Sequence, residues 1–274
     1  MPHLLSRTLT VTVTVTGCLS LLLLGAPSAS AVTAAPPGSG ALTQQLQHWA
    51  AGRMSTMSVL VRDERSGRSW SFRPSAAYDN ASIVKLNILQ TVLYQAQQKH
   101  RGLTTWEQQQ AVPMIRVSDN DAATALWNHV GGARGVAAYD RVLGLTATTF
   151  DSQGHWGLTR STVTDQVRLV RAVGHGPGPL STSARSYVRT QMAHVRSDQH
   201  WGVSAGPTPR DTVELKNGWL PLRTHGWRVN SIGHITSNGR DYTLAILTQD
   251  NPTMTYGIAT IEGASRIVFR ALAP

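Results

Sequence analysis

The chain has 274 residues, a formal charge of +10 and a single cysteine, Cys18. This length allows one large domain or two closely packed subdomains with a substantial core. The 22 arginines and three lysines are scattered without a basic run or an aromatic ladder, so we expect no nucleic-acid partner, although the positive charge is compatible with anionic wall polymers.

Residues 1–31 have the pattern of a secretory signal peptide. Arg7 supplies a short basic region, residues 11–24 form an apolar run, and the stretch ending at Ala31 has the small residues after which a signal peptidase cuts. The run is shorter than the roughly 20 apolar residues that span a bilayer. We therefore expect a secreted or extracytoplasmic cell-surface protein without a stable membrane span. An uncleaved anchor is the alternative.

Cys18 raises a second possibility for the N-terminus, because Val15-Thr-Gly-Cys18 resembles a lipid-attachment box. A lipobox normally closes the apolar run, but here the run continues beyond Cys18, which argues against lipid anchoring. Cleavage after Ala31 would leave a mature chain without cysteine. Such a chain has no disulfide, thiol nucleophile or thiolate metal site.

Residues 32–40 are rich in proline and glycine and are predicted to be a disordered leader, and residues 41–274 to be one domain. Apolar spacing predicts a helix at 42–50 and then strands at 57–61 and 69–72. A helical block follows, at 83–98, 122–130, 136–143, 161–173 and 183–194. The chain is predicted to end with strands at 213–216, 227–236 and 241–248 and a helix at 255–272. This order predicts an α+β fold in which strands from both ends form one antiparallel sheet beside the helical block.

Ser82-Ile-Val-Lys85 opens one of the predicted helices. Residues three apart lie on one helical face, so the hydroxyl and the amine can approach each other. A serine hydroxyl needs a base to become a nucleophile. A buried lysine can lose its proton, whereas arginine cannot. The pair therefore predicts nucleophilic chemistry, and the competing interpretation is an ordinary surface lysine.

Ser118-Asp-Asn120 begins the next predicted helix after Ser82. Helix capping would explain the first two residues, because their side chains can accept from free N–H groups of the first turn. The functional interpretation is a hydroxyl that relays a proton and an asparagine amide that binds a substrate amide.

Lys216-Asn-Gly218 ends a predicted strand. A glycine there lets a ligand approach the strand closely, and the lysine offers a positive charge to a carboxylate. The competing interpretation is a simple turn, since Asn-Gly is a common turn pair.

Taken together, the three motifs occur in the order Ser-x-x-Lys, Ser-Asp-Asn and Lys-x-Gly, and this set resembles class A β-lactamases and penicillin-binding proteins. Residues 115–132 and 162–173 extend the resemblance, which covers nearly the whole mature chain. It implies an α/β/α fold with a five-stranded antiparallel sheet flanked by helices. It also implies an all-helical subdomain, trimmed here because the segment from Ser82 to Ser118 is short.

The resemblance also implies a role for each matching residue. Ser82 would be the acylated nucleophile, Lys85 its base or part of the base relay, and Ser118 the proton donor to the leaving nitrogen. The substrate would be bound by Asn120, Lys216, Asn217, Gly218 and Trp219. The oxyanion hole would consist of the backbone N–H groups of Ser82 and Trp219. Trp156 is a second tryptophan expected near the site.

The sequence departs from the class A pattern in two places. No glutamate lies between Glu107 and Glu214, so the omega-loop base for deacylation is missing, and residues 144–160 offer only Asp151 in its place. Asn217 replaces the usual Thr or Ser of the third motif. Both departures affect turnover more than acylation.

We therefore predict a secreted serine hydrolase that cleaves a β-lactam or related amide through a Ser82 acyl-enzyme, with slow deacylation. A D,D-carboxypeptidase-like hydrolase of cell-wall peptides and a non-catalytic ligand-binding relative are the alternatives. The partner would be a small-molecule or peptidoglycan-derived acyl substrate. No cofactor is expected. No metal is expected either, because histidines such as His155 and His234 show no recognisable metal-binding spacing. The chain is expected to be a monomer.

Overall fold

The computed structural model describes residues 39–273 except 176–177, 223, 225 and 238. The predicted signal peptide at 1–31 and most of the predicted leader lie outside these residues. The first helix begins at Ser39, so the last two residues of the 32–40 leader belong to it.

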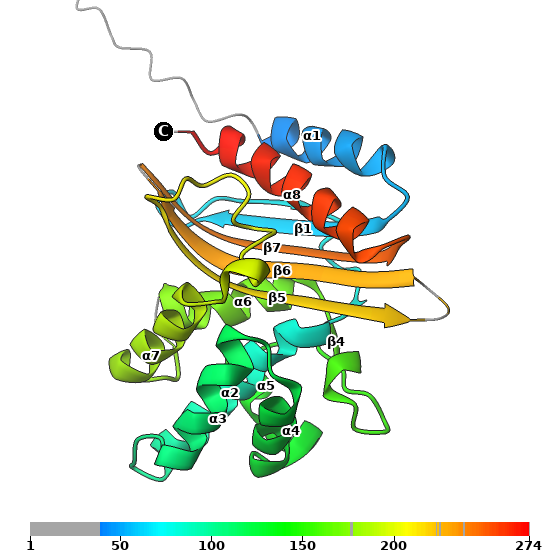
Figure 1. The fold of residues 1–274 in the computed structure, drawn as a ribbon. Coiled ribbons are helices and arrows are strands. Elements are labelled where there is room, and N and C mark those ends of the chain that lie inside the picture. The colour runs from blue at the N-terminus through cyan, green and yellow to red at the C-terminus, as the bar shows by residue number, and fades with distance from the viewer. Residues whose placement is uncertain (1–38, 176–177, 223, 225, 238, 274) are drawn as a thin grey trace, which may run out of the picture. The chain divides into compact units, whose positions relative to one another are not determined.

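The predicted α+β architecture is confirmed (Figure 1). A five-stranded antiparallel sheet has the order β2-β1-β7-β6-β5, and a separate short pair joins β3 to β4. The strands of the large sheet are β1 (Thr56–Asp63), β2 (Ser69–Phe72), β5 (Thr212–Leu222), β6 (Gly226–Ser237) and β7 (Arg240–Asn251). The short pair is β3 (Tyr78–Asp79) and β4 (Arg160–Ser161). The central strands β1 and β7 pair from Thr56 with Gln249 to Asp63 with Tyr242.

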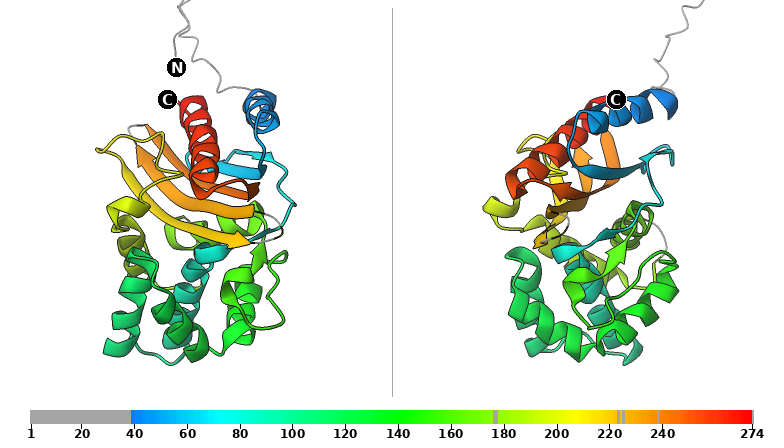
Figure 2. Two further views of the ribbon diagram at one scale, coloured as in Figure 1. Left: turned by 45° about the vertical axis from the view of Figure 1, so that its right-hand side comes forward. Right: turned by 90° about the vertical axis from the view of Figure 1, so that its right-hand side faces the viewer.

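Helices cover both faces of the large sheet (Figure 2). The first and last helices, α1 (Ser39–Ala51) and α8 (Met254–Ala271), pack on one face. The other face carries α2 (Val84–Gln98), α3 (Thr105–Arg116), α4 (Asn120–His129), α5 (Gly132–Leu143), α6 (Val163–Gly174) and α7 (Thr182–Ala193). Three short 3₁₀ turns are η1 (Ala81–Ile83), η2 (Trp156–Leu158) and η3 (Ser197–Gln199).

The sheet separates two apolar cores because side chains alternate between its faces. On β7, Leu244 and Ile246 pack toward α1 and α8, whereas Ala245 and Leu247 pack toward the helical block. The same alternation directs the side chain of Lys216, which pairs with Ile232 across the strands, toward the helical block. The candidate site therefore lies on the helical side of the sheet.

Helix α2 is the central helix of this block, and its residues 84–93 are all buried. The sequence predicted a single apolar face, but neighbouring helices surround α2, so its polar side chains need internal partners. Gln90 donates to Leu169 O at 3.0 Å and accepts from Tyr139 Oη at 2.9 Å. Asn87 donates to Asp140 Oδ1 at 2.7 Å.

Helix α3 was not predicted from the sequence. Its signal was nevertheless present, because Thr104 and Glu107 form a capping box in which each side chain accepts from the other residue's backbone N–H. Pro113 lies inside this helix and obscures it in the sequence pattern. The Glu107 carboxylate also forms hydrogen bonds with Arg101 and with His129, the last residue of α4, and these link α3 to the end of α4.

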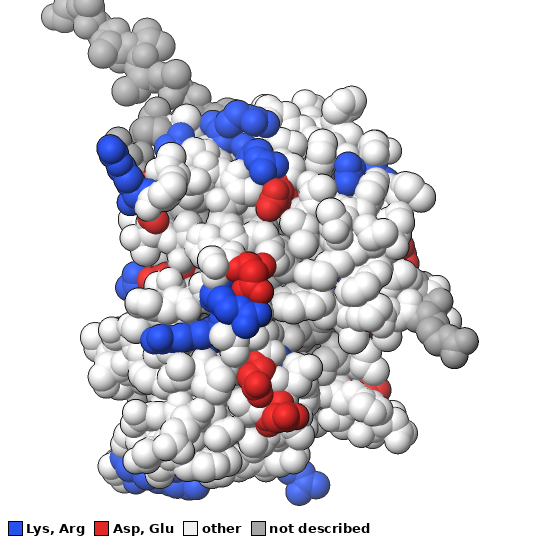
Figure 3. Space-filling view, in the orientation of Figure 1, with Lys and Arg blue, Asp and Glu red and all other residues white. Residues whose placement is uncertain are grey.

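No helix in the described part of the chain is both long and apolar enough to cross a membrane. On the face shown in Figure 3, Lys and Arg side chains form several separated groups, some of them beside Asp or Glu. This face therefore presents no continuous basic surface, in line with the scattered arginines of the sequence.

Candidate active site

Ser82 lies in η1, in a turn whose backbone is strained and tightly packed. Ala81, directly before it, has a φ of 49°, a left-handed conformation that is unfavourable for a residue with a Cβ. Strand β5 crosses this turn at Gly218, where a Cβ would lie 2.8 Å from Asn80 O, Ser82 N and Ile83 N. The glycine that was predicted to admit a ligand therefore admits the turn that carries Ser82.

Three buried polar residues that were not predicted from the sequence hold this turn in place, two from strand β6 and one from β4. Arg228 Nε donates to Asp79 Oδ2 at 2.9 Å, and Asn230 Nδ2 donates to the backbone oxygens of Asp79 and Asn80 at 2.9 and 3.1 Å. Ser161 Oγ donates to Asn80 Oδ1 at 2.5 Å. The partners come from distant parts of the chain, so no local pattern could have revealed them.

Ser118 Oγ lies between two buried lysine amines. Lys85 Nζ and Lys216 Nζ each donate to it at 3.1 Å. A hydroxyl oxygen can accept two hydrogen bonds and still donate its own proton. Asp119, rather than Ser118, caps α4 by accepting from Ala122 N at 2.8 Å. Capping therefore explains Asp119 but not Ser118, whose hydroxyl is held by the lysines.

Burial lowers the pKa of both lysines. Both side chains are fully buried. Loss of solvation lowers the pKa of Lys85 to about 7, although the negative charge of Asp119 opposes this shift. The pKa of Lys216 lies well below its ordinary value because of burial and the nearby positive charge of Lys85. A neutral amine, as required of a general base, is thus accessible at Lys85 near neutral pH.

The Lys85 amine makes further contacts in this geometry. It donates to Ser118 O at 2.5 Å and to Asn120 Oδ1 at 2.8 Å, and it lies 5.0 Å from the centre of the Trp156 ring. Among the described residues no hydrogen bond joins Lys85 Nζ to Ser82 Oγ, although the two residues are one helical turn apart. Catalytic hydrogen bonds in ligand-free enzymes often tighten only when substrate binds.

A cleft of about 460 Å³ opens beside Ser82. Ser82, Asn120, Trp156 and Trp219 line it, as expected from the sequence, together with Ala81, His155, Gly157, Leu158, Leu220 and Leu222. Asn120 Oδ1 is bound to Lys85, so its amide nitrogen can donate into the cleft. Lys85, Ser118 and Lys216 are not among the lining residues. They lie behind Asn120, which accepts from Lys85, and Lys216 donates to Ser118 Oγ.

The side chain of Asn217 points away from this cleft. Neighbouring residues of a strand face opposite sides, and Asn217 Nδ2 donates to Gln199 O at 2.7 Å and to Trp201 O at 2.9 Å. It anchors the segment before β5 against the other face of the sheet. The structure therefore gives Asn217 a structural position, in contrast to the predicted contact with substrate.

Asp151 organises its own loop. Its Oδ2 accepts from the backbone N–H groups of Gln153 and His155 at 3.0 and 3.1 Å and contacts His155 Nδ1 at 2.8 Å. These hydrogen bonds hold the pKa of the Asp151 carboxyl below its ordinary value. No Asp or Glu is among the described residues that line the cleft. The carboxylate that would activate water in a class A enzyme has no counterpart there.

The chain belongs to the Beta-lactamase enzyme family, which matches residues 104–272, including Ser118 and Lys216. Proteins named "Putative lipoprotein LppW" from Mycobacterium tuberculosis (strain ATCC 25618 / H37Rv) and Mycobacterium bovis are 27% identical over 226 residues. These 226 residues span 80% of this chain and 71% of each relative.

Solved structures show the same fold at low identity. A class A β-lactamase from Mycobacterium abscessus is 23% identical with a TM-score of 0.73 and covers 84% of this chain and 98% of its own. A variant of the class A β-lactamase of the last common ancestor of Gram-negative bacteria is 20% identical with a TM-score of 0.74 and covers 84% and 98%. PBP-A is 20% identical with a TM-score of 0.73 and covers 84% and 95%.

Proposed function

We propose that this protein is an extracytoplasmic serine hydrolase that opens a β-lactam or a related amide by forming an ester on Ser82. The observation that carries the proposal is the position of Ser118 Oγ, which is 3.1 Å from both Lys85 Nζ and Lys216 Nζ. Two buried amines on one hydroxyl cost desolvation energy, and a structural role alone does not require them. The arrangement supports proton transfer beside the cleft.

In the proposed reaction, Ser82 Oγ attacks the carbonyl carbon of the substrate while Lys85 takes the hydroxyl proton. The negative charge that develops on the carbonyl oxygen would be stabilised by the N–H groups of Ser82 and Trp219, each worth about 3–4 kcal/mol in comparable sites. Ser118 then passes a proton to the leaving nitrogen as the C–N bond breaks, and it can be reprotonated from the lysines. Asn120 would bind a substrate amide at the mouth of the cleft.

Deacylation is proposed to be slow. Hydrolysis of the ester needs a base to activate water, and the described residues lining the cleft include neither Asp nor Glu. The Asp151 carboxylate already accepts hydrogen bonds from backbone N–H groups of its own loop. The remaining route uses Lys85 and Ser118, the same groups that serve acylation.

The test combines a time course with a chromogenic cephalosporin and intact-mass measurement of the protein. We expect colour release of about one equivalent per chain, then a much slower phase, with an adduct that maps to Ser82. Ser82→Ala should show neither, and Ser66→Ala, which removes an exposed serine between β1 and β2, should behave as wild type. Folded wild-type protein without adduct and without turnover would overturn the proposal for this substrate class.

A D,D-carboxypeptidase-like activity is the second candidate, because it uses the same nucleophile without an omega-loop glutamate. Release of D-alanine from a muropeptide, lost in Ser82→Ala, would support it over β-lactam hydrolysis. If wild type and Ser82→Ala bind the muropeptide equally without forming an ester, the chain would instead be a non-catalytic ligand-binding relative.

An extracytoplasmic location is part of the proposal. It is supported by the signal-like residues 1–31 and by the lipoprotein name of the LppW relatives. Two maturation routes differ at Cys18: cleavage after Ala31 removes it, whereas lipid attachment makes it the first residue. The mass of the mature N-terminal peptide distinguishes these routes, and we expect a peptide that starts at Val32.

A further inference from the structure

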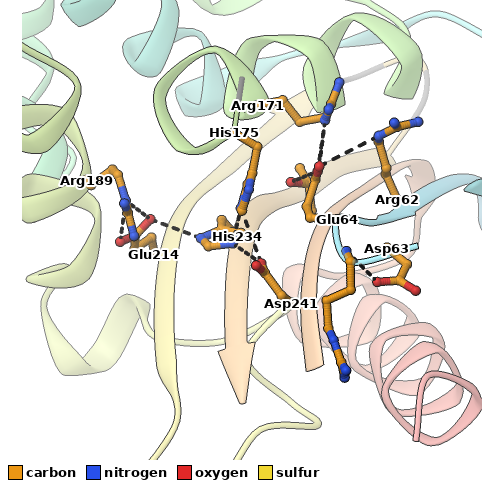
Figure 4. Close-up of polar contacts among 11 residues, drawn as sticks. Arg62, Asp63, Glu64, Arg171, His175, Arg189, Glu214, His234 and Asp241 are labelled. Carbon is orange, nitrogen blue, oxygen red and sulfur yellow. Dashed lines mark hydrogen bonds and ion pairs between the residues drawn. The ribbon is translucent and has the colours of Figure 1, made fainter. Parts of the chain in front are cut away.

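A second polar cluster lies on the helical side of the sheet (Figure 4). None of its residues lines the Ser82 cleft. His175 follows the last residue of α6, His234 lies on β6 and Asp241 on β7. His234 Nε2 is 2.7 Å from both His175 Nε2 and Asp241 Oδ1. The remaining pair, His175 Nε2 and Asp241 Oδ1, is 3.2 Å apart. Three potential ligand atoms from three elements therefore converge on one point.

Hydrogen bonding alone does not satisfy this triangle. An imidazole nitrogen either carries a proton and donates, or lacks one and accepts, but it cannot do both. If His234 Nε2 donates to Asp241, its contact with His175 Nε2 is repulsive or shares the same proton at an unfavourable angle. If it accepts from His175, its lone pair faces a carboxylate oxygen. A single cation beside the triangle would receive a lone pair from all three atoms.

The surrounding residues orient His234 for such a role. Glu214 Oε2 lies 3.3 Å from His234 Nδ1, and Arg189 Nε donates to both oxygens of Glu214 at 2.9 and 3.0 Å (Figure 4). A carboxylate on Nδ1 places a proton there and leaves the Nε2 lone pair for a metal, the arrangement that commonly supports histidine ligands. Arg189 neutralises the negative charge of Glu214. The negative charge available to a bound metal ion therefore comes from Asp241.

Access and neighbouring charge also fit a small cation. The side chain of His234 is 4% exposed, whereas those of His175 and Asp241 are 25% and 30% exposed, so the open side of the triangle reaches solvent. The nearest arginine on α6, Arg171, is itself held by both oxygens of Glu64 at 2.9 and 3.0 Å. Its positive charge is thus compensated within the cluster.

We propose that His175, His234 and Asp241 bind one divalent transition-metal ion such as Zn²⁺, through Nε2, Nε2 and Oδ1. Two imidazole nitrogens and one carboxylate oxygen suit this class of metal, with bonds of about 2.0–2.1 Å and at least one position left for water. The ion would tie the end of α6 to β6 and β7. This proposal does not depend on acylation of Ser82. It revises the expectation of no metal. That expectation rested on the spacing of histidines in the sequence, whereas the fold brings together residues that are far apart in the sequence.

The test titrates Zn²⁺ into untagged, metal-stripped protein and measures binding by calorimetry, stoichiometry by elemental analysis and the thermal unfolding midpoint. We expect one ion per chain and a thermal unfolding midpoint that Zn²⁺ raises and EDTA returns to the value of the metal-free protein. Co²⁺ bound in place of Zn²⁺ should show the visible absorption of a site with few ligands. Asp241→Asn and His175→Gln should each weaken Zn²⁺ at least about 10–100-fold. Both replace partly exposed side chains and should remain folded.

His48→Gln serves as the matched control, because His48 is an exposed histidine on α1 outside the cluster. It should bind Zn²⁺ as wild type does. The proposal is overturned if wild type binds no ion at one equivalent, or if Asp241→Asn and His175→Gln bind Zn²⁺ as tightly as wild type and His48→Gln, which would mark the binding as adventitious.

Discussion

Raising the pH from about 4 to 7 is expected to destabilise this protein through one buried carboxyl group, Asp140. Burial raises the pKa of Asp140 from 3.8 to about 7, although the hydrogen bond from Asn87 opposes the shift. Asp140 Oδ2 and Asn87 Oδ1 are both buried without a partner among the described residues. A proton on Asp140 Oδ2 would join these two oxygens and complete a reciprocal pair with the Asn87 Nδ2 donor.

The magnitude follows from the difference between the folded and unfolded pKa values. The folded pKa is raised, so the stability that it contributes is fully present below about pH 4 and is lost as the pH rises to about 7. The two values differ by about three pH units, and each unit corresponds to about 1.4 kcal/mol, so the total loss is roughly 4 kcal/mol. The loss acts on α2, the helix that carries Lys85.

Asp140→Asn isolates this contribution, because an asparagine amide reproduces the donor and acceptor of the protonated carboxyl but does not titrate. Urea unfolding followed by circular dichroism should be measured between pH 4.5 and 7.5. We expect the free energy of unfolding of wild type to fall relative to Asp140→Asn by about 1.4 kcal/mol per pH unit. Asp121→Asn, which changes an exposed carboxylate on α4, should leave the wild-type slope nearly unchanged. Parallel curves for wild type and Asp140→Asn would refute the reciprocal pair.

Three further changes test the site and its support. Gly218→Ala places a Cβ 2.8 Å from Ser82 N, so we expect the free energy of unfolding in urea to fall by about 1–3 kcal/mol. We also expect no adduct on Ser82 by intact mass. Acylation of this variant at the wild-type level would contradict the close approach. Because the pKa of Lys85 is lowered to about 7, the acylation rate of wild type should rise with pH below 7 and level off above it. Lys85→Arg should form no adduct. An acylation rate of wild type that stays constant from pH 5.5 to 8.5 would exclude Lys85 as the base. Hydrogen bonds, chiefly from Arg101, lower the pKa of Glu107 to about 2 against the opposing effect of burial, so Glu107→Gln should cost about 1–3 kcal/mol at pH 7. That difference should narrow as the pH falls from about 4.5 to 2, and a constant difference would count against the ion pair.

Local patterns in the sequence predicted most of the fold, because apolar periodicity reports secondary structure directly. The five strands and the surrounding helices were confirmed, apart from α3, whose Pro113 interrupts the pattern. The order of Ser82, Ser118 and Lys216 was enough to predict the family. Their convergence could not be predicted from spacing alone, since it depends on how the sheet and the helices pack.

The remaining parts of the site depend on contacts between distant segments. Asn217 occupies a motif position, but strand alternation turns its side chain to the other face of the sheet. Arg228 and Asn230 hold the turn of Ser82 from a strand near the other end of the chain. The cluster of His175 and His234 likewise becomes visible only when β6 lies beside the end of α6.

The pairing of β1 with β7 has a consequence for how the chain folds. Val59 meets Ile246, so the central strand pair closes only after nearly the whole domain has been synthesised. Closing so long a loop is entropically costly, and folds dominated by such distant contacts form slowly. An N-terminal fragment would carry β1, β2 and the helices around α2 but lack three of the five strands of the sheet. Such a chain should remain unfolded until its last strands are available.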